Sequence, residues 1–150
     1  MTNETDTPQL VVVGVDGSAE SIAALGWAGR YAAATGAKVR AVLAWHYPTA
    51  AAVPPVGLTP EPINKEVTER MDASLAGAVD AVFPGASAQV ERQLTYGHPA
   101  EVLVEESKGA DLLVVGSRGH AAFTGMLVGS VSIHCVTHAS CPVVVVRSRD

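Results

Sequence analysis

Residues 112–130 read Leu-Leu-Val-Val-Gly-Ser-Arg-Gly-His-Ala-Ala-Phe-Thr-Gly-Met-Leu-Val-Gly-Ser, and the rest of the chain is arranged around them. Their first part is a short apolar run, typical of a buried strand, which stops at Gly116. Further glycines space the loop that follows, and Ser130 can begin a helix. An apolar strand, a glycine loop and a helix start together present backbone N–H groups to an anion. The segment therefore predicts a phosphate-binding loop.

The composition predicts one domain with an aliphatic core. The chain has 150 residues, of which 48% are hydrophobic, 17% charged and only 5% aromatic. A single large core made of Val, Leu and Ala is therefore expected. Residues 1–9 are predicted to be a disordered N-terminal tail because they are mostly polar, and residues 10–150 are predicted to form a single domain.

Strands and helices are predicted to alternate along the chain. Apolar or alternating runs predict strands at 10–15, 39–45, 88–95, 112–115 and 143–146. Amphipathic segments predict helices at 19–35, 64–83, 100–107 and 130–138. This alternation predicts a doubly wound, Rossmann-like α/β fold, with a five-stranded parallel sheet and helices on both faces.

The polarity pattern of each strand predicts its place in the sheet. The alternating strand 88–95 fits an edge, whereas the apolar first, fourth and fifth strands fit the interior, which favours the order 3-2-1-4-5. In this order, strands are added to one side of the first strand and then, from the fourth strand on, to its other side, so the order reverses between the first and fourth strands. The turn with Gly14 and Asp16 then meets the loop with Gly116 and Gly119 at the carboxyl ends of these strands, where ligands of open α/β sheets bind.

The glycine spacing fits neither common phosphate-binding motif. The loop lacks the lysine of a Walker A sequence and the Gly-x-Gly-x-x-Gly pattern of dinucleotide-binding folds. It reads instead Gly-x2-Gly-x9-Gly-Ser from Gly116 to Ser130. This spacing resembles the nucleotide-binding signature of the universal stress protein family, and residues 11–18 and 138–146 are similar to that family's first and last strands. The resemblance covers residues 10–147.

Resemblance to the ATP-binding branch of this family implies a site for ATP, with Mg2+ as an optional companion. It implies that Asp16 binds the ribose or holds Mg2+, that Ala44 contacts the adenine through its backbone, and that the glycine loop wraps the phosphates. The implied cofactor-binding residues are Gly14, Asp16, Ala44, Gly116, Ser117, Arg118, Gly119, His120, Gly129, Ser130 and Val131. Because the loop contains no lysine, binding would depend on backbone dipoles, the helix start and, where present, Mg2+.

Several of these residues also have a purely structural interpretation. Asp16 can close a turn or cap the first helix, the glycines can serve tight turns, and Arg118 and His120 can point to solvent. Segment 134–138 contains two histidines and a cysteine, which cannot easily face one ion together, so helix surface and a core thiol are expected there. No metal ligand other than Asp16, through Mg2+, is predicted.

The resemblance supports a nucleotide-binding regulatory protein rather than an enzyme. Fast ATP hydrolysis needs a positioned water and strong stabilisation of transition-state charge. No general base is evident, because the histidines are scattered along the chain, so no catalytic residue and at most slow hydrolysis are expected. Two alternatives stay open: a nucleotide-free protein-interaction module of the same fold, and an enzyme of the related adenine-nucleotide α-hydrolase folds.

Charge and hydropathy indicate which partners to expect. The net charge is −5 without a Lys/Arg cluster, which argues against nucleic acid. No apolar run is long enough to span a membrane and residues 1–8 lack a signal-peptide pattern, so a cytoplasmic protein is expected. The valine-rich strand 143–146 ends the predicted sheet, and a homodimer through this strand, common in the family, is expected. The proline-rich segment 46–62 predicts a surface loop, whose role as a lid stays open.

Overall fold

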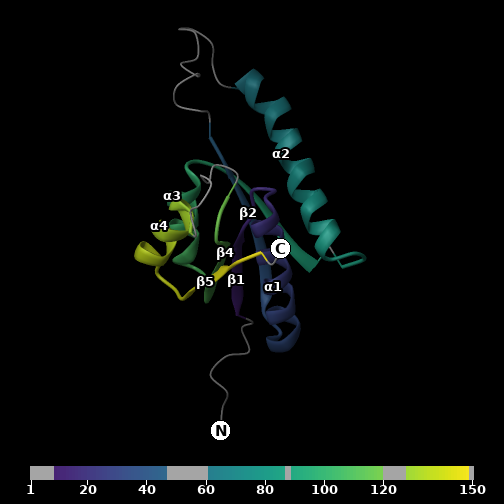
Figure 1. Cartoon of the computed structure of the whole chain (residues 1–150). Coiled ribbons are helices and arrows are strands. Elements are labelled where there is room, and N and C mark those ends of the chain that lie inside the picture. The colour runs from purple at the N-terminus through teal and green to yellow at the C-terminus, as the bar shows by residue number, and fades with distance from the viewer. Residues whose placement is uncertain (1–8, 47–60, 87–88, 120–127, 149–150) are drawn as a thin grey trace.

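The computed structural model describes residues 9–46, 61–86, 89–119 and 128–148. Strands and helices alternate along the described chain, as predicted (Figure 1). The strands are β1 (Leu10–Gly14), β2 (Lys38–Trp45), β3 (Val90–Tyr96), β4 (Leu112–Gly116) and β5 (Val143–Val146). The helices are α1 (Ala19–Thr35), α2 (Glu61–Val82), α3 (Pro99–Ser107) and α4 (Ser130–His138).

The strands form one parallel sheet in the order β3-β2-β1-β4-β5, which confirms the predicted topology. Val12 of β1 is in register with Arg40 of β2 on one side and with Leu113 of β4 on the other. Helices α1 and α2 cover one face of the sheet, and α3 and α4 cover the other (Figure 1). The neighbours β1 and β4 thus lead to helices on opposite faces, so the chain diverges at their carboxyl ends.

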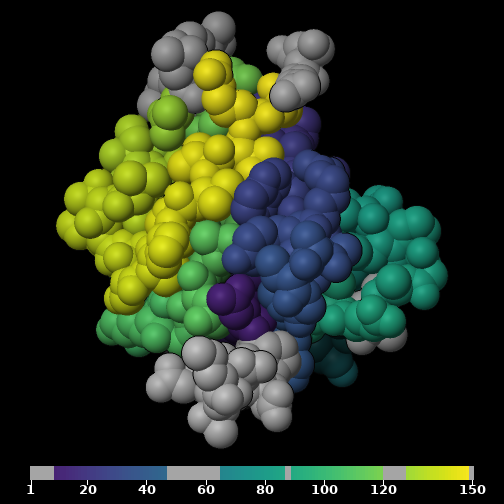
Figure 2. All heavy atoms as spheres, turned by 90° about the horizontal axis from the view of Figure 1, so that it is seen from below, coloured from purple at the N-terminus to yellow at the C-terminus, as the bar shows by residue number. Residues whose placement is uncertain are grey.

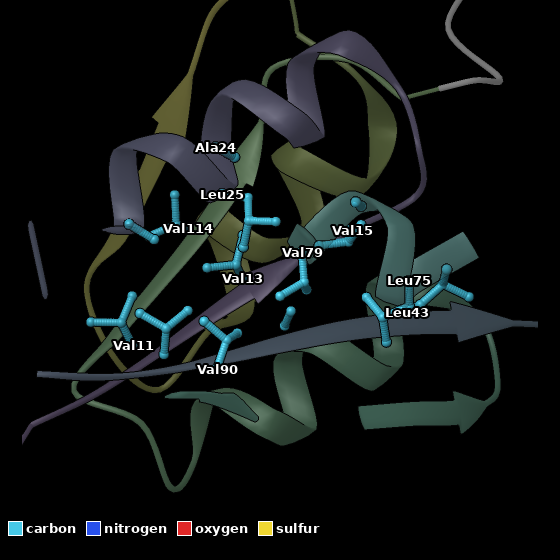
Figure 3. Close-up of a cluster of buried hydrophobic side chains, with 14 of the residues drawn as sticks. Val11, Val13, Val15, Ala24, Leu25, Leu43, Leu75, Val79, Val90 and Val114 are labelled. Atoms are coloured by element: carbon cyan, nitrogen blue, oxygen red, sulfur yellow. The ribbon is translucent and has the colours of Figure 1, made fainter. Parts of the chain in front are cut away.

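Two clusters of aliphatic side chains hold the layers together, one on each face of the sheet. Alternate residues of β1 divide between them, since Val11 and Val13 belong to the α1–α2 side and Val12 to the α3–α4 side. Figure 3 shows the first cluster, in which Leu25 of α1 and Val79 of α2 meet the sheet. All five side chains are fully buried, and each such burial contributes about 1.5–3 kcal/mol to stability.

Helix α1 begins and ends where the sequence indicates. The Ser21 backbone N–H donates a hydrogen bond of 3.2 Å to Ser18 Oγ, which caps the helix. Gly36 ends the helix with φ 77°, a left-handed conformation that glycine adopts without steric cost. Figure 2 shows α1 (blue) between the C-terminal segment (yellow) and α2 (teal). Helix α1 therefore covers the middle of the sheet on its face, and its first turn packs on the end of β4.

Some boundaries and positions differ from the prediction. Helix α2 begins at Glu61, earlier than the expected residue 64, because Pro62 is accepted in the first turn of a helix, where its missing N–H costs nothing. Strand β3 begins at Val90, later than expected. The apolar composition of β5 alone predicts an interior strand, and this is wrong. β5 is an edge strand with half-buried valines, because the sheet ends there.

Some predictions concern residues outside the described ranges: most of the N-terminal tail, the body of the proline-rich segment and His120. Gln9, which the prediction places in the tail, is joined to the sheet, since its carbonyl accepts a hydrogen bond of 2.8 Å from the Lys38 N–H. Among the helices of the described ranges, none has the length and apolarity that a membrane crossing needs. The cytoplasmic location stays a prediction.

Candidate functional site

A cavity of about 290 Å3 lies at the carboxyl ends of β1 and β4, where the predicted crevice is. Its volume is near the lower end of the range of about 300–1,000 Å3 that is typical of ligand pockets. Its walls come from the ends of β1, β2 and β4 and from the first turns of α1, α3 and α4. Segments from both the first and the second half of the chain therefore contribute to one site.

Most of the predicted site residues line this cavity. They are Gly14, Asp16, Ala44, Gly116, Arg118, Gly119, Gly129, Ser130 and Val131. Ser117 lies behind the wall, where its N–H donates to the Val146 carbonyl at 2.8 Å and its own carbonyl accepts from the Gly129 N–H. The structure thus brings the two distant glycine turns together. That these turns bind a nucleotide stays a prediction.

The described glycines of the loop let neighbouring segments pack closely against the loop backbone, and they do not serve left-handed turns. A Cβ at Gly116 would lie 2.7 Å from the Glu20 carbonyl carbon, so the first turn of α1 packs directly on the end of β4. A Cβ at Gly119 would lie 2.5 Å from Asp16 Oδ2. Neither Gly116, Gly119 nor Gly129 has a positive φ, so tight left-handed turns do not explain the described part of the motif.

Asp16 adopts the turn that its structural interpretation predicts. Its Oδ1 accepts hydrogen bonds from the Ser18 N–H, at 2.9 Å, and from the Ser18 hydroxyl. Its Oδ2 lies against Gly119, on the loop after β4. The carboxylate therefore spans the mouth of the cavity between the two glycine turns, and it is exposed there to a ligand or an ion.

Arg118 is held by Glu20 in the first turn of α1. Its Nη2 lies 3.2 Å from Glu20 Oε1, and the Ser148 hydroxyl donates to the same oxygen at 3.2 Å. A backbone hydrogen bond at Glu20, assisted by Ser148 and Arg118, lowers the pKa of this carboxyl. Glu20 is therefore ionised at neutral pH, and the guanidinium is paired rather than directed to solvent.

The start of α4 forms the wall opposite α1. Gly129 occupies the N-cap position, and no side chain caps the helix there. The buried Ser132 hydroxyl donates a hydrogen bond to the Gly116 carbonyl, which ties the first turn of α4 to the end of β4. The positive end of the helix dipole and the exposed Ser130 are thus placed at the cavity, an arrangement that favours an anion.

Sequence reasoning missed part of the lining. The missed residues are Val15, Ser18, Ser21, Val42, Pro99, Leu103, Val115 and Ser132. Val42 precedes Ala44 by two positions on β2, so the strand period points both to the same face, and this signal could have found it. Pro99 and Leu103 reach the site only because α3 packs over β1, where Leu103 Cδ1 would lie 2.7 Å from a Cβ at Gly14. No local pattern indicates that contact.

The histidines are less scattered than the sequence suggests. The rings of His46 and His98 stack with centroids 5.2 Å apart, and those of His134 and His138 lie 4.5 Å apart on α4. Neither pair lines the cavity. Within the described residues, no group of three or more His, Cys, Asp or Glu side chains could hold a metal ion. Cys135 is buried, and desolvation raises the pKa of its thiol to about 11, in keeping with a core thiol.

Fold and site together define a class of protein: an open, doubly wound α/β domain with a ligand-sized cavity at the point where its strand order reverses. Residues 9–147 match the universal stress protein family. The chain therefore belongs to the universal stress protein family, as the glycine spacing predicts.

Individual relatives agree with this assignment. A universal stress protein from Mycolicibacterium smegmatis is 37% identical over 139 residues, which cover 93% of this chain and 46% of that protein. The chain thus spans about half the length of the curated relatives it matches. A solved universal stress protein in complex with cAMP has a TM-score of 0.66 and 32% identity, covering 93% of this chain and 97% of its own.

A more distant structure shows the same fold. A universal stress protein from Archaeoglobus fulgidus, in complex with dAMP, has a TM-score of 0.62 and 22% identity. It covers 95% of this chain and 99% of its own. The five-stranded architecture is therefore shared over the full domain.

Proposed function

We propose that the protein binds an adenine nucleotide in the cavity at the carboxyl ends of β1 and β4, and that it acts as a nucleotide-responsive regulatory protein. The observation that carries this proposal is the convergence of the turn after β1 and the loop after β4 on one cavity. The relative in complex with cAMP, 32% identical over most of this chain, supports it. Because the loop resembles the signature of the family's ATP-binding branch, ATP, with or without Mg2+, is one candidate ligand.

The cavity offers different chemistry to the two halves of a nucleotide. Towards β2 and α3 it is lined by Val42, Ala44 and Leu103, which form an apolar slot suited to the adenine ring. Towards β4 and α4 it is lined by segment 116–119 and the start of α4, which offer backbone N–H groups and a serine hydroxyl to phosphate oxygens. Asp16 also lines the cavity, and we expect its carboxylate to contact the ribose.

The proposed role is binding without efficient catalysis. The ionisable side chains of the described lining are Asp16 and Arg118. The Arg118 guanidinium is already paired with the Glu20 carboxylate. Rapid phosphoryl transfer needs a residue that positions the attacking water and cations that stabilise the transition state. This lining supports at most slow hydrolysis of a bound nucleotide.

The direct test is to release the ligand from the purified protein by heat and to separate the supernatant by anion-exchange chromatography. An adenine nucleotide near one per chain is the expected result. Titration of the emptied protein with cyclic AMP and ATP, with and without Mg2+, then identifies the preferred nucleotide. An empty supernatant, combined with no thermal shift in millimolar nucleotide, would reject the proposal in favour of a nucleotide-free interaction module.

Replacing Asp16 by asparagine tests whether the charge of Asp16 contributes to ligand binding or whether the side chain only stabilises the turn. Asparagine retains the side-chain oxygen that accepts from the Ser18 N–H, so the stability should change by less than about 0.5 kcal/mol. Affinity for adenosine, which carries the ribose but no phosphate, should fall about tenfold, because a hydrogen bond to a charged group contributes about 1.5–3 kcal/mol. Calorimetric titration measures the affinity. Unchanged affinity in Asp16→Asn, with a loss of stability in Asp16→Ala, would show that Asp16 serves the turn alone.

A homodimer through β5 is a further part of the proposal. The valines of this edge strand are half-buried in the monomer, and an uncovered edge favours pairing with a second chain. Ile133 and Val136 of the neighbouring α4 are 52% and 58% exposed and extend the apolar surface. Light scattering after gel filtration should give twice the chain mass of 15.4 kDa. A mass of one chain at micromolar concentration would contradict the dimer.

A further inference from the structure

We propose that Glu20 sets the charge preference of the cavity: by holding Arg118, it makes the site favour adenine ligands with little phosphate charge over polyphosphates. This inference rests on the proposed nucleotide site and names the residue that selects among its ligands. Glu20 itself is not part of the cavity lining, whereas Arg118 is. Glu20 thus acts as a positioning residue, through the guanidinium.

The first observation is the charge balance at the cavity. Among the described lining residues, only Asp16 and Arg118 carry a formal charge. Glu20 Oε1 lies 3.2 Å from Arg118 Nη2 and neutralises the single cation. The three side chains together therefore have a net charge of one negative unit. A ligand with several phosphate charges meets no net attraction from them, whereas a ligand with one charge or none is little affected.

The second observation is that the protein fixes Glu20 in this place. The Glu20 backbone packs against Gly116, where a Cβ would lie 2.7 Å from its carbonyl carbon. Its side chain is only 13% exposed, compared with 39% for Arg118, so solvent screens the pair incompletely. The Ser148 hydroxyl donates to the same carboxylate oxygen, and the position in the first turn of α1 favours a negative charge. Glu20 is therefore a stable, ionised competitor of phosphate for Arg118.

The expected behaviour follows from this competition. A phosphate that recruits Arg118 must take it from Glu20, and a polyphosphate must also approach the Glu20 carboxylate. Removing the carboxylate by Glu20→Gln frees the guanidinium and removes the repulsion, while glutamine preserves the size and the helix propensity of the side chain. Removing the cation by Arg118→Gln leaves an uncompensated carboxylate, so its effect on polyphosphate should have the opposite sign.

The experiment titrates the full chain calorimetrically with adenosine, cyclic AMP and ATP, in EDTA and at fixed ionic strength. In Glu20→Gln, affinity for ATP should rise about fivefold, while affinity for adenosine changes less than about twofold. In Arg118→Gln, the ratio of ATP to adenosine affinity should fall below that of the wild type. The Glu20→Gln effect should shrink as salt is added. If Glu20 contributed to folding alone, its substitution would change neither the ratio of ATP to adenosine affinity nor the salt dependence of this ratio.

Glu66→Gln is the matched control, because it removes the same charge from the exposed Glu66–Arg70 pair on α2 and should leave all three affinities unchanged. If the wild type binds any of the three ligands but the ratio is the same in Glu20→Gln, the inference about Glu20 is wrong and the proposed site stands. If none of the ligands binds to any variant, the proposed function fails, and the inference fails with it.

Discussion

Replacing Gly116 by alanine is expected to lower the free energy of unfolding by about 1–3 kcal/mol, because the added methyl group has no room. The Cβ would lie 2.7 Å from the Glu20 carbonyl carbon and 2.9 Å from its oxygen. These are backbone atoms in the first turn of α1, so the collision is relieved only by moving the helix away from β4. Urea unfolding measures the loss of stability. Nucleotide affinity should also fall, since α1 and β4 border the cavity.

Gly77→Ala is the matched control for this prediction. Gly77 lies on the exposed side of α2, and a Cβ there meets nothing within 4 Å. The same chemical change should therefore raise stability by about 0.5–1 kcal/mol, because alanine loses less backbone entropy in a helix than glycine does. Equal effects of the two substitutions would contradict the close packing of α1 on β4.

Truncation of Leu113 is expected to be the most destabilising single change, at about 2–5 kcal/mol for Leu113→Ala. Its side chain is fully buried in the cluster between the sheet and α3–α4, together with Val12, Val42 and Leu103. The substitution removes buried apolar area and leaves a cavity that a parallel sheet cannot close, because its strands are fixed by their ladder of hydrogen bonds. Urea unfolding again gives the change in free energy.

Val42 and Leu103, which belong to the same cluster as Leu113, also line the candidate site. The Leu113→Ala variant should therefore lose nucleotide affinity together with stability. Glu69→Ala, on the exposed side of α2, is the control for truncating a side chain and should alter stability by less than about 0.5 kcal/mol. A loss of unfolding free energy below about 1 kcal/mol in Leu113→Ala would show that the surrounding side chains collapse into the cavity or that the cluster is poorly packed.

Most of the architecture was predictable because local patterns encode it. Strands such as β1 and β4 are short, aliphatic and end at a glycine, and α1 between them has a serine N-cap and a glycine C-cap. Alternation of strands and helices leaves few topologies open, and the alternating β3 identifies one sheet edge. The error at β5 has the same origin. Apolar composition measures how well a strand tolerates burial, and it does not say whether another strand lies beside it.

The candidate site was predictable where its residues belong to the sequence motif. The turn with Asp16 and the loop from Gly116 follow strands that must be neighbours in the predicted order, so their meeting follows from topology. Pro99 and Leu103 were not predictable, because α3 reaches the cavity through packing between elements distant in sequence. The family resemblance identifies the motif residues, but it does not indicate that Pro99 and Leu103 line the cavity.

The parallel α/β fold, the strand order, the family and the position of the candidate cavity follow from the sequence, because periodicity and glycine spacing are local properties that can be recognised without coordinates. The contacts that the motif residues make are visible in the folded structure alone. It shows that Gly116 admits the backbone of α1, that Asp16 closes a turn against Gly119, and that Arg118 is paired with Glu20, 98 positions away. Such contacts depend on distances between elements set by packing of the whole core, and no short stretch of sequence encodes them.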